Sequence, residues 1–230
     1  MLKNKVGEYN KNKALIPQPA STLEIRPLLL ISLGFEGFLA LAYVLNEYLE
    51  DRLYWPRFPT IRELVFGALL ALLLFVFNAV LIRVSYYRKE ALKANSTEGA
   101  NLALGWQSIT DFVDEYIFPL ASRLNIWSAL LIALAAGIGE ELFFRGLLQP
   151  KIGIIAASFL FSLTHFVFEL RKYWLLVVLY FLIGLLFGLI YELFDSLWVP
   201  VIFHVLYDFC ALLYFRFIFP AVHERVRAPV

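Results

Sequence analysis

The sequence predicts an all-α fold: a polytopic integral membrane bundle of about six transmembrane helices with one additional interfacial helix. Hydrophobic residues make up 61% of the 230 residues and only 17% are charged, a balance typical of membrane proteins and not of soluble domains. The apolar residues gather into runs of roughly 20, which is the length of an α-helix that crosses a bilayer. The net charge of +1 excludes a basic surface for nucleic acid.

The chain begins with a polar tail, residues 1–26, which has no apolar core of a signal peptide and is predicted to lie in the cytoplasm. N-terminal membrane helices and a polar segment follow in residues 27–125, then a membrane core in residues 126–219 and a C-terminal tail in residues 220–230. The predicted spans are residues 27–45, 64–82, 126–148, 152–168, 174–194 and 198–219.

The distribution of Lys and Arg sets the predicted orientation. Because most of them fall in the segments on the side of the amino terminus, we expect both termini in the cytoplasm and the protein in the cytoplasmic membrane. Residues 106–124 carry Asp111, Asp114 and Glu115 and therefore predict a helix at the interface and not a span. The expected aromatic anchors at span ends are Tyr54, Trp55, Trp127, Tyr173, Trp174 and Trp198.

Two adjacent carboxylates and an arginine interrupt the third predicted span. An ionisable side chain at membrane depth costs at least about 2.5 kcal/mol, so by default it faces the protein interior and marks a functional site. Residues four apart share a helix face, whereas neighbours are about 100° apart. Glu141 is therefore predicted to pair with Arg145, while Glu140 points elsewhere without a neutralising partner on its own helix.

Further ionisable groups lie at similar depths in two later spans. His165 is in the fourth span, and His204 and Asp208 are one turn apart in the sixth. Counted at 1.5 Å per residue from the non-cytoplasmic helix ends, these groups and Glu140 lie at depths of roughly 9 to 20 Å. The overlap of these depths predicts a single buried polar cavity formed by three helices.

Each of these residues also has a purely structural interpretation. A single intramembrane histidine often only bridges two helices through a hydrogen bond, and a Glu–Arg pair often only neutralises itself. The G-x-x-x-G spacing of Gly184 and Gly188 predicts a packing face. Four further polar residues are interpreted as lying near the ends of spans: Glu36, Asn78, Glu169 and Glu192. Cys210 is interpreted as a packing residue.

The predicted cavity has the groups of a hydrolase. A carboxylate beside an imidazole can hold and deprotonate a water molecule, and a second imidazole with its own carboxylate can stabilise an oxyanion or orient a carbonyl. The set of Glu140, His165 and His204 also matches the ligands of catalytic zinc, although no H-E-x-x-H spacing is present. Ser158 and Ser162 lie close enough to keep a serine nucleophile open.

Three motifs resemble those of the CPBP family, which contains the CAAX prenyl proteases and the bacteriocin-processing intramembrane proteases. They are E-E-x-x-x-R from Glu140 to Arg145, F-x-x-x-H from Phe161 to His165, and H-x-x-x-N/D from His204 to Asp208. The stretch G-L-L-F-G-L-I-Y-E-L-F-D-S-L-W-V-P-V-I-F-H, which leads into the last motif, is also similar to the family's pattern. The resemblance covers about residues 126–212.

The resemblance implies a glutamate-dependent intramembrane endopeptidase of the CAAX-protease type. In that family Glu140 would be the general base on water and His165 its partner, while Glu141 and Arg145 would support the site.

By the same resemblance, His204 and Asp208 would be the pair that stabilises the oxyanion or orients the substrate. The family's last motif often ends in Asn, which can donate a hydrogen bond, whereas an ionised Asp cannot. Orienting His204 is therefore the role we expect for Asp208.

The expected partner is a protein or peptide substrate that is membrane-associated or lipid-modified and is reached through the bilayer. No cofactor is required in this interpretation, and a divalent metal such as zinc is the alternative. The predicted topology places Glu140 and His204 toward the non-cytoplasmic side, which suits an exported peptide or the membrane anchor of a surface protein.

Two functions of other classes stay open. Some relatives are thought to act as immunity or scaffold proteins, in which the motif residues would only hold helices together. A small transporter is less favoured, because buried Glu and His form proton relays but the sequence shows no inverted repeat.

Overall fold

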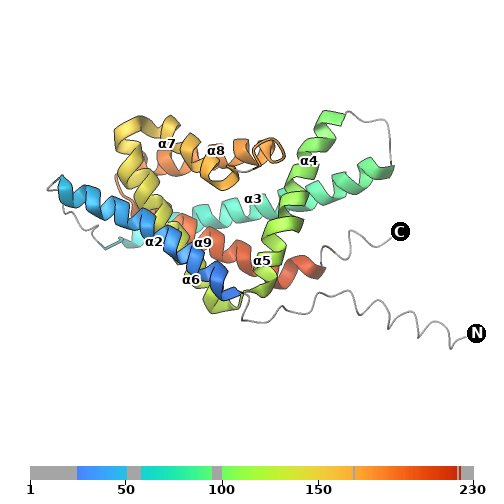
Figure 1. Cartoon of the computed structure of the whole chain (residues 1–230), viewed down its shortest axis with the longest axis horizontal. Coiled ribbons are helices and arrows are strands. Elements are labelled where there is room, and N and C mark those ends of the chain that lie inside the picture. The colour runs from blue at the N-terminus through green and yellow to red at the C-terminus, as the bar shows by residue number, and fades with distance from the viewer. Residues whose placement is uncertain (1–24, 51–57, 95–99, 168, 222, 224–230) are drawn as a thin grey trace, which may run out of the picture.

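The computed structural model describes residues 25–50, 58–94, 100–167, 169–221 and 223, and this part of the chain is helical without strands (Figure 1). Five of its helices are long and apolar enough to cross a membrane. They are Leu29–Leu49, Ile61–Lys89, Ile126–Phe166, Trp174–Phe194 and Trp198–Ala221. The predicted all-α membrane bundle is thus confirmed.

Some predicted features lie outside the described residues. They are much of the N-terminal tail, the anchors Tyr54 and Trp55, and residues 224–230.

The elements follow one another with short connections. They are α2 (Ile25–Leu49), α3 (Ile61–Ala94), α4 (Ala100–Phe112), the π-helical turn η2 (Val113–Ile117), α5 (Phe118–Arg123), α6 (Ile126–Glu141), the π-helical turn η3 (Leu142–Leu148), α7 (Gln149–Phe166), α8 (Trp174–Phe194), α9 (Trp198–Leu213) and the π-helical turn η4 (Tyr214–Ile218). Asn125 begins α6 as its cap, since its side chain accepts a hydrogen bond from the backbone N–H of Ser128.

The α9 helix forms the centre of the bundle. It packs against both α3 and α6, while α2 packs on α6 and α7 packs along α8. Figure 1 shows α4 and α5 running across the direction of α3. Apolar side chains such as Leu73 on α3 and Leu193 on α8 are exposed, as lipid-facing residues are. The bundle therefore buries its polar groups between helices and presents apolar side chains outward.

The predicted third and fourth spans follow each other in the structure without a loop between them, as a run of helical residues with a kink at Gly153. This run, Ile126–Phe166, has 41 residues and would measure about 60 Å if straight, twice the thickness of the hydrocarbon core. Gly153 divides it, because its φ of 82° and ψ of 161° interrupt the helical backbone. The chain therefore turns at Gly153, and Figure 1 shows α7 running in a different direction from α6.

Replacing Gly153 by alanine should lower the free energy of unfolding by about 1 to 3 kcal/mol, because its backbone conformation is open almost only to glycine. A Cβ atom there would meet nothing within 4 Å, so the loss would report the backbone alone. Thermal unfolding in detergent is the measurement. The control is Gly34→Ala in α2, which also has open space but helical backbone, and it should be neutral or stabilising. Equal losses for both variants would contradict this account.

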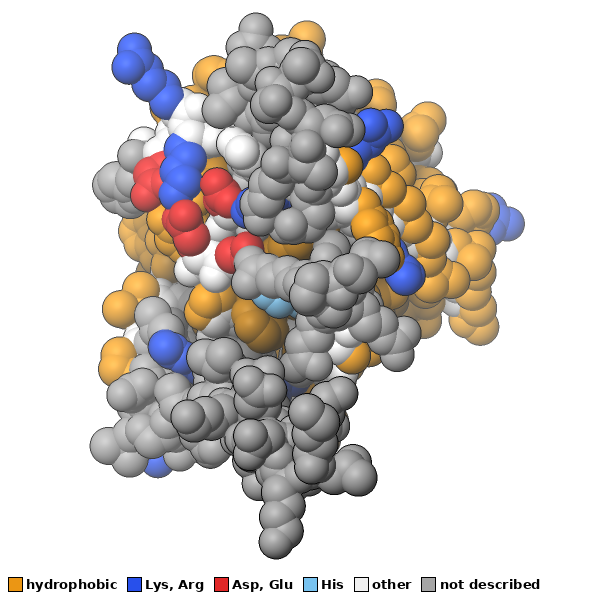
Figure 2. Space-filling view, turned by 90° about the vertical axis from the view of Figure 1, so that its right-hand side faces the viewer, with side chains coloured by type: hydrophobic (Ala, Val, Ile, Leu, Met, Phe, Trp, Pro, Cys, Tyr) orange, Lys and Arg blue, Asp and Glu red, His pale blue; other side chains and the backbone are white. Residues whose placement is uncertain are grey.

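The helical segment from α4 to α5 lies at a charged end of the molecule. Acidic and basic side chains gather on this end in Figure 2, whereas hydrophobic side chains cover the adjoining flank. Lys89 pairs with Asp111 at 2.9 Å, and Lys172 pairs with Glu115 at 2.5 Å. The segment is not among the helices apolar enough to span a membrane, which agrees with the predicted interfacial helix.

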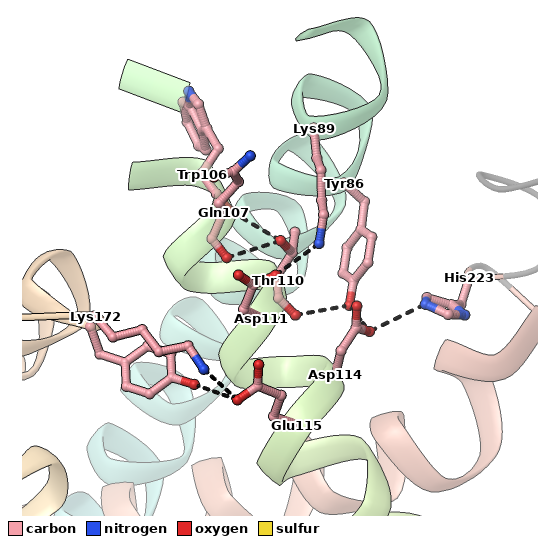
Figure 3. Close-up of polar contacts among 11 residues, drawn as sticks. Tyr86, Lys89, Trp106, Gln107, Thr110, Asp111, Asp114, Glu115, Lys172 and His223 are labelled. Carbon is pink, nitrogen blue, oxygen red and sulfur yellow. Dashed lines mark hydrogen bonds and ion pairs between the residues drawn. The ribbon is translucent and has the colours of Figure 1, made fainter. Parts of the chain in front are cut away.

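Hydrogen bonds tie this interfacial segment to the ends of other helices (Figure 3). The hydroxyl of Tyr86 donates to Asp114 at 2.5 Å, and Tyr173 donates to Glu115 at 3.0 Å. The ammonium group of Lys172 donates to Glu115 and holds the pKa of that carboxyl below its usual value, while burial raises the pKa of Tyr173 to about 12. The network fixes one end of α3 and the turn before α8 to the same segment.

Candidate functional site

The two adjacent carboxylates at the end of α6 point to different helices. Glu141 is completely buried, and its Oε2 lies 3.2 Å from Nε of Arg145. Its Oε1 lies 2.8 Å from Nδ1 of His204 on α9, which donates this hydrogen bond because an ionised carboxylate only accepts. Glu141 therefore links α6 to α9, and the predicted Glu141–Arg145 pair is confirmed.

The π-helical turn η3 carries Arg145 to the centre of the site. Its guanidinium Nη2 donates to the backbone carbonyl of Gly184 on α8 at 3.1 Å. Its carbon Cζ lies 4.6 Å from the ring centre of Phe161 and 5.1 Å from that of Phe187. An arginine between a carboxylate, a carbonyl and aromatic rings is neutralised and held in one orientation. Arg145 thus stabilises Glu141 and connects α6 to α8.

Glu140 faces His165 on α7. Its Oε1 lies 3.7 Å from Nε2 of His165, and its Oε2 has no hydrogen-bond partner among the described residues. Nδ1 of His165 lies 2.8 Å from the backbone carbonyl of Phe161, and because a carbonyl only accepts, Nδ1 is the protonated nitrogen of the neutral ring. Nε2 therefore presents a lone pair toward Glu140.

Asp208 completes the second histidine's surroundings. Its Oδ2 lies 3.5 Å from Nε2 of His204, one helical turn earlier on α9. The His204 ring is buried and stacks on Phe187, with ring centres 5.0 Å apart, whereas the side chain of Asp208 is 28% exposed. His204 is thus fixed by Glu141 on one nitrogen and faces Asp208 with the other.

The structure brings together the residues predicted from the sequence, but as two linked groups. The first group is the pair of Glu140 and His165. The second group is built around the contact between Glu141 and His204. The predicted packing face of Gly184 and Gly188 is also present, since Cβ atoms at these positions would come within 3.1 Å of Ser158 and 2.7 Å of Ile154.

Two buried polar residues were missed as members of this region. Gln149 donates to the carbonyl of Gly188 at 3.1 Å and to Glu192 at 3.0 Å, so it continues the line of contacts between η3 and α8. Glu36 on α2 is buried, and its carboxyl is close enough to interact electrostatically with Glu140. Interpreting Glu36 as a span-end residue is therefore wrong. The signal was available, because Glu36 interrupts an apolar run as Glu140 does.

Asn78 was also assigned to a span end, and the structure corrects this interpretation. Its side-chain amide donates to the hydroxyl of Tyr207, on the helix that carries His204. Asn78 therefore connects α3 to α9 at Tyr207, the residue that precedes Asp208. Its amide serves a contact between two helices, which a single polar residue inside an apolar span does not predict by itself.

The described residues do not assemble the ligand set predicted for zinc. Among them, no three His, Cys, Asp or Glu side chains are grouped so that they could hold a metal ion. His204 turns one ring nitrogen to Glu141 and the other to Asp208, so neither is directed to the pair of Glu140 and His165.

A serine nucleophile does not fit this geometry either. Ser162 is completely buried, and its hydroxyl donates to the carbonyl of Phe159 at 2.8 Å. Ser158 is buried against Gly184, where α7 approaches α8. Both residues thus serve the contact of α7 with its surroundings.

The comparisons with known proteins agree with the motifs. Residues 122–210 match the family model described as type II CAAX prenyl endopeptidase Rce1-like. The uncharacterized protein YpbD of Bacillus subtilis (strain 168) is 38% identical over 87 residues, which are 38% of this chain and 45% of that protein. The match therefore spans less than half of the length of this relative. No solved structure gives a significant match. The three motifs on α6, η3, α7 and α9 lie inside the matched region, so residues 122–210 are similar to the CPBP family in both sequence and motif order.

Proposed function

We propose that this protein is an intramembrane endopeptidase that hydrolyses a peptide bond with water activated by Glu140 and His165. The observation that carries the proposal is the buried Glu140, whose Oε2 has no hydrogen-bond partner among the described residues while His165 presents Nε2 to its other oxygen. Such a pair can hold a water molecule between a base and an acceptor. The similarity of residues 122–210 to the CAAX prenyl endopeptidases supports the same reaction class.

In this mechanism a water molecule donates one hydrogen bond to Glu140 and one to Nε2 of His165. Glu140 takes a proton as the water oxygen attacks the carbonyl carbon of the substrate, which forms a tetrahedral oxyanion. Glu140 then returns the proton to the nitrogen of the leaving amine as the C–N bond breaks. One water is consumed, and a carboxylic acid and an amine are released.

The group of His204 and Asp208 would act on the substrate carbonyl in the same mechanism. Glu141 fixes the ring through Nδ1, so that Nε2 is directed to Asp208 and to the space beside it. Asp208 orients the ring, and the ring stabilises or orients the carbonyl oxygen as negative charge develops on it. Glu141 and Arg145 position this group without touching the substrate.

The test compares membrane peptides and surface proteins from cells that carry wild type, Glu140→Gln or His165→Ala. We expect the same precursor or terminal fragment to accumulate in both variants, with cleavage reduced at least about 100-fold, which is the usual contribution of a general base. The matched control is Glu47→Gln on α2, a carboxylate outside the site whose partner is Asn46. Expression and thermal stability of each variant are measured in parallel.

The opposite outcome would support a non-catalytic immunity or scaffold protein. In that case both variants would rescue the phenotype of complete deletion, and their peptide profiles would match the wild type. The buried contacts from Glu141 through Arg145 to Gly184 hold three helices together, so they serve a scaffold as well as an enzyme. Proton transport that is lost in Glu140→Gln without any change in peptides would indicate the transporter.

Substrate, side of access and zinc dependence are further parts of the proposal. The substrate would be a membrane-associated or lipid-modified protein or peptide, and its cleavage site would identify the class. Lys151 pairs with Glu50 at 2.7 Å, and this contact between the start of α7 and the end of α2 supports the predicted topology, in which both lie on one side of the membrane. Reporter fusions in the Lys151 loop test whether this side is non-cytoplasmic. Cleavage by purified protein with and without a zinc chelator tests the metal.

A further inference from the structure

A cavity of about 350 Å³ lies between α2, α5 and α6 beside the site. Its volume is at the lower end of the range for ligand pockets in proteins. Most of its wall is apolar, and Glu36 is the one acidic residue among those that line it. The lining residues are Leu29, Ile31, Ser32, Phe35, Glu36, Leu120 and Ile132. An apolar pocket with a single strong hydrogen-bonding group suits an apolar ligand that offers one polar contact.

Glu36 connects this cavity to the site. Gly139, which precedes Glu140, lies directly against it, since a Cβ atom on Gly139 would come within 2.8 Å of Oε2 of Glu36. The carboxyl of Glu36 also interacts electrostatically with Glu140, His204 and Asp208. Glu36 therefore belongs to the wall of the cavity and also lies next to the residues of the site.

The Glu36 carboxyl is buried without being satisfied. Only 7% of the residue is exposed, and its Oε2 has no hydrogen-bond partner in the described part of the chain. A buried polar atom without a partner is costly, so a native structure that keeps one needs a reason, and a bound partner or a role in catalysis is such a reason. The neighbouring Glu140 and Asp208 are acceptors when ionised and do not supply the missing donor.

An apolar peptide segment that is cleaved in a membrane has backbone N–H groups that lack hydrogen-bond acceptors. Its backbone N–H groups are satisfied inside a helix, but a helix has to open before a peptide bond becomes accessible to water. Each N–H released in this way loses its acceptor, and no water replaces it in the hydrocarbon region. A protein acceptor placed beside the cleaved bond removes that deficit.

We propose that Glu36 is a substrate-positioning residue whose carboxyl oxygen accepts a backbone N–H from an extended apolar peptide segment in the cavity between α2 and α6. This proposal rests on the proposed endopeptidase function and adds a binding subsite to it. The hydrogen bond holds the segment in register with Glu140, so that one defined peptide bond faces the activated water. The apolar wall accommodates the side chain next to that bond.

The experiment uses purified full-length protein in lipid nanodiscs and a fluorogenic peptide built on the precursor that accumulates in Glu140→Gln cells. A set of peptides carries a single N-methyl group on each backbone amide in turn, which removes one donor at a time. The variants are Glu36→Leu, which removes the acceptor, and Glu36→Gln, which keeps an acceptor oxygen without the charge. Ser32→Phe fills the cavity from another part of its wall, and Glu47→Leu on the same helix is the control.

For Glu36→Leu we expect KM to rise about tenfold with kcat changed much less, and Glu36→Gln should stay within about threefold of the wild type. Ser32→Phe should also raise KM, while Glu47→Leu should not. One N-methylated peptide should have an approximately tenfold higher KM with wild type and the same KM as its parent with Glu36→Leu. If Glu36 has only a structural role, Glu36→Leu should lower thermal stability, and the N-methylated peptide should raise KM with this variant as much as with wild type.

The outcomes separate the two proposals. If Glu140→Gln cleaves the peptide as fast as wild type, the endopeptidase function fails and this subsite fails with it. If Glu140→Gln is inactive but every N-methylated peptide affects wild type and Glu36→Leu equally, only the subsite is overturned. A loss in Glu36→Gln as large as in Glu36→Leu would show that a cation of the substrate, and not a backbone N–H, is bound.

Discussion

Replacing Arg145 by methionine should destabilise the protein by about 3 to 5 kcal/mol, the largest effect that we expect from one substitution. Only 1% of Arg145 is exposed and Glu141 is completely buried, so the change would leave a carboxylate in the interior without its cation. It would also remove the hydrogen bond to Gly184 and the guanidinium contact with Phe161. Thermal and denaturant-induced unfolding in detergent measure the loss.

A double variant separates charge from packing in this prediction. Glu141→Gln combined with Arg145→Met removes both charges, and it should recover part of the stability that Arg145→Met loses. Arg83→Met on α3 is the matched control, because Arg83 is exposed and its loss should change stability little. If Arg145→Met unfolded like the wild type, the buried pair would not hold α6 in the bundle.

Gly137→Ala should reduce cleavage about 100-fold, because it forces α6 away from the helix that carries His204. A Cβ atom on Gly137 would lie 2.8 Å from the backbone nitrogen of Val205, the residue after His204. Backbone atoms cannot rotate out of the way as a side chain does, so the helices must separate. The 2.8 Å contact between Glu141 and His204 spans the same two helices and should lengthen. The measurement is the rate of peptide cleavage in nanodiscs.

Stability should fall less than activity in the Gly137 variant. Overpacking of a tight contact costs about 1 to 3 kcal/mol, which a folded bundle can tolerate. Gly37→Ala on α2 is the control, because a Cβ atom there would meet nothing within 4 Å. Full activity in Gly137→Ala would show that the spacing between α6 and α9 does not determine the geometry of the site.

The sequence predicted contacts within a helix better than contacts between helices. The pair of Glu141 and Arg145 and the pair of His204 and Asp208 follow from residues four apart on one face. Matching depths also indicated that the three motifs meet. The bond between Glu141 and His204 was not predicted, because membrane helices are apolar on all sides and their pattern does not show which face meets which neighbour.

The limits of the predicted spans explain the remaining differences. The apolar run around Gly153 hides a turn, since a glycine in such a run also fits an uninterrupted helix or a packing face. Glu36 was assigned to a span end, although it lies near the middle of α2. A tertiary contact with Gly139, far along the chain, decides its surroundings, and local sequence does not contain that contact.

The neighbouring positions of Glu140 and Glu141 have a mechanical consequence. Their side chains reach α7 and α9 in different directions from adjacent residues of one helix. A rotation of α6 about its own axis would therefore lengthen one of these contacts as it shortens the other. The activation of water by Glu140 and the orientation of the His204 ring by Glu141 are thus coupled through α6, a helix that carries neither histidine. A small molecule wedged between α2 and α6 would disturb both steps without contacting the scissile bond.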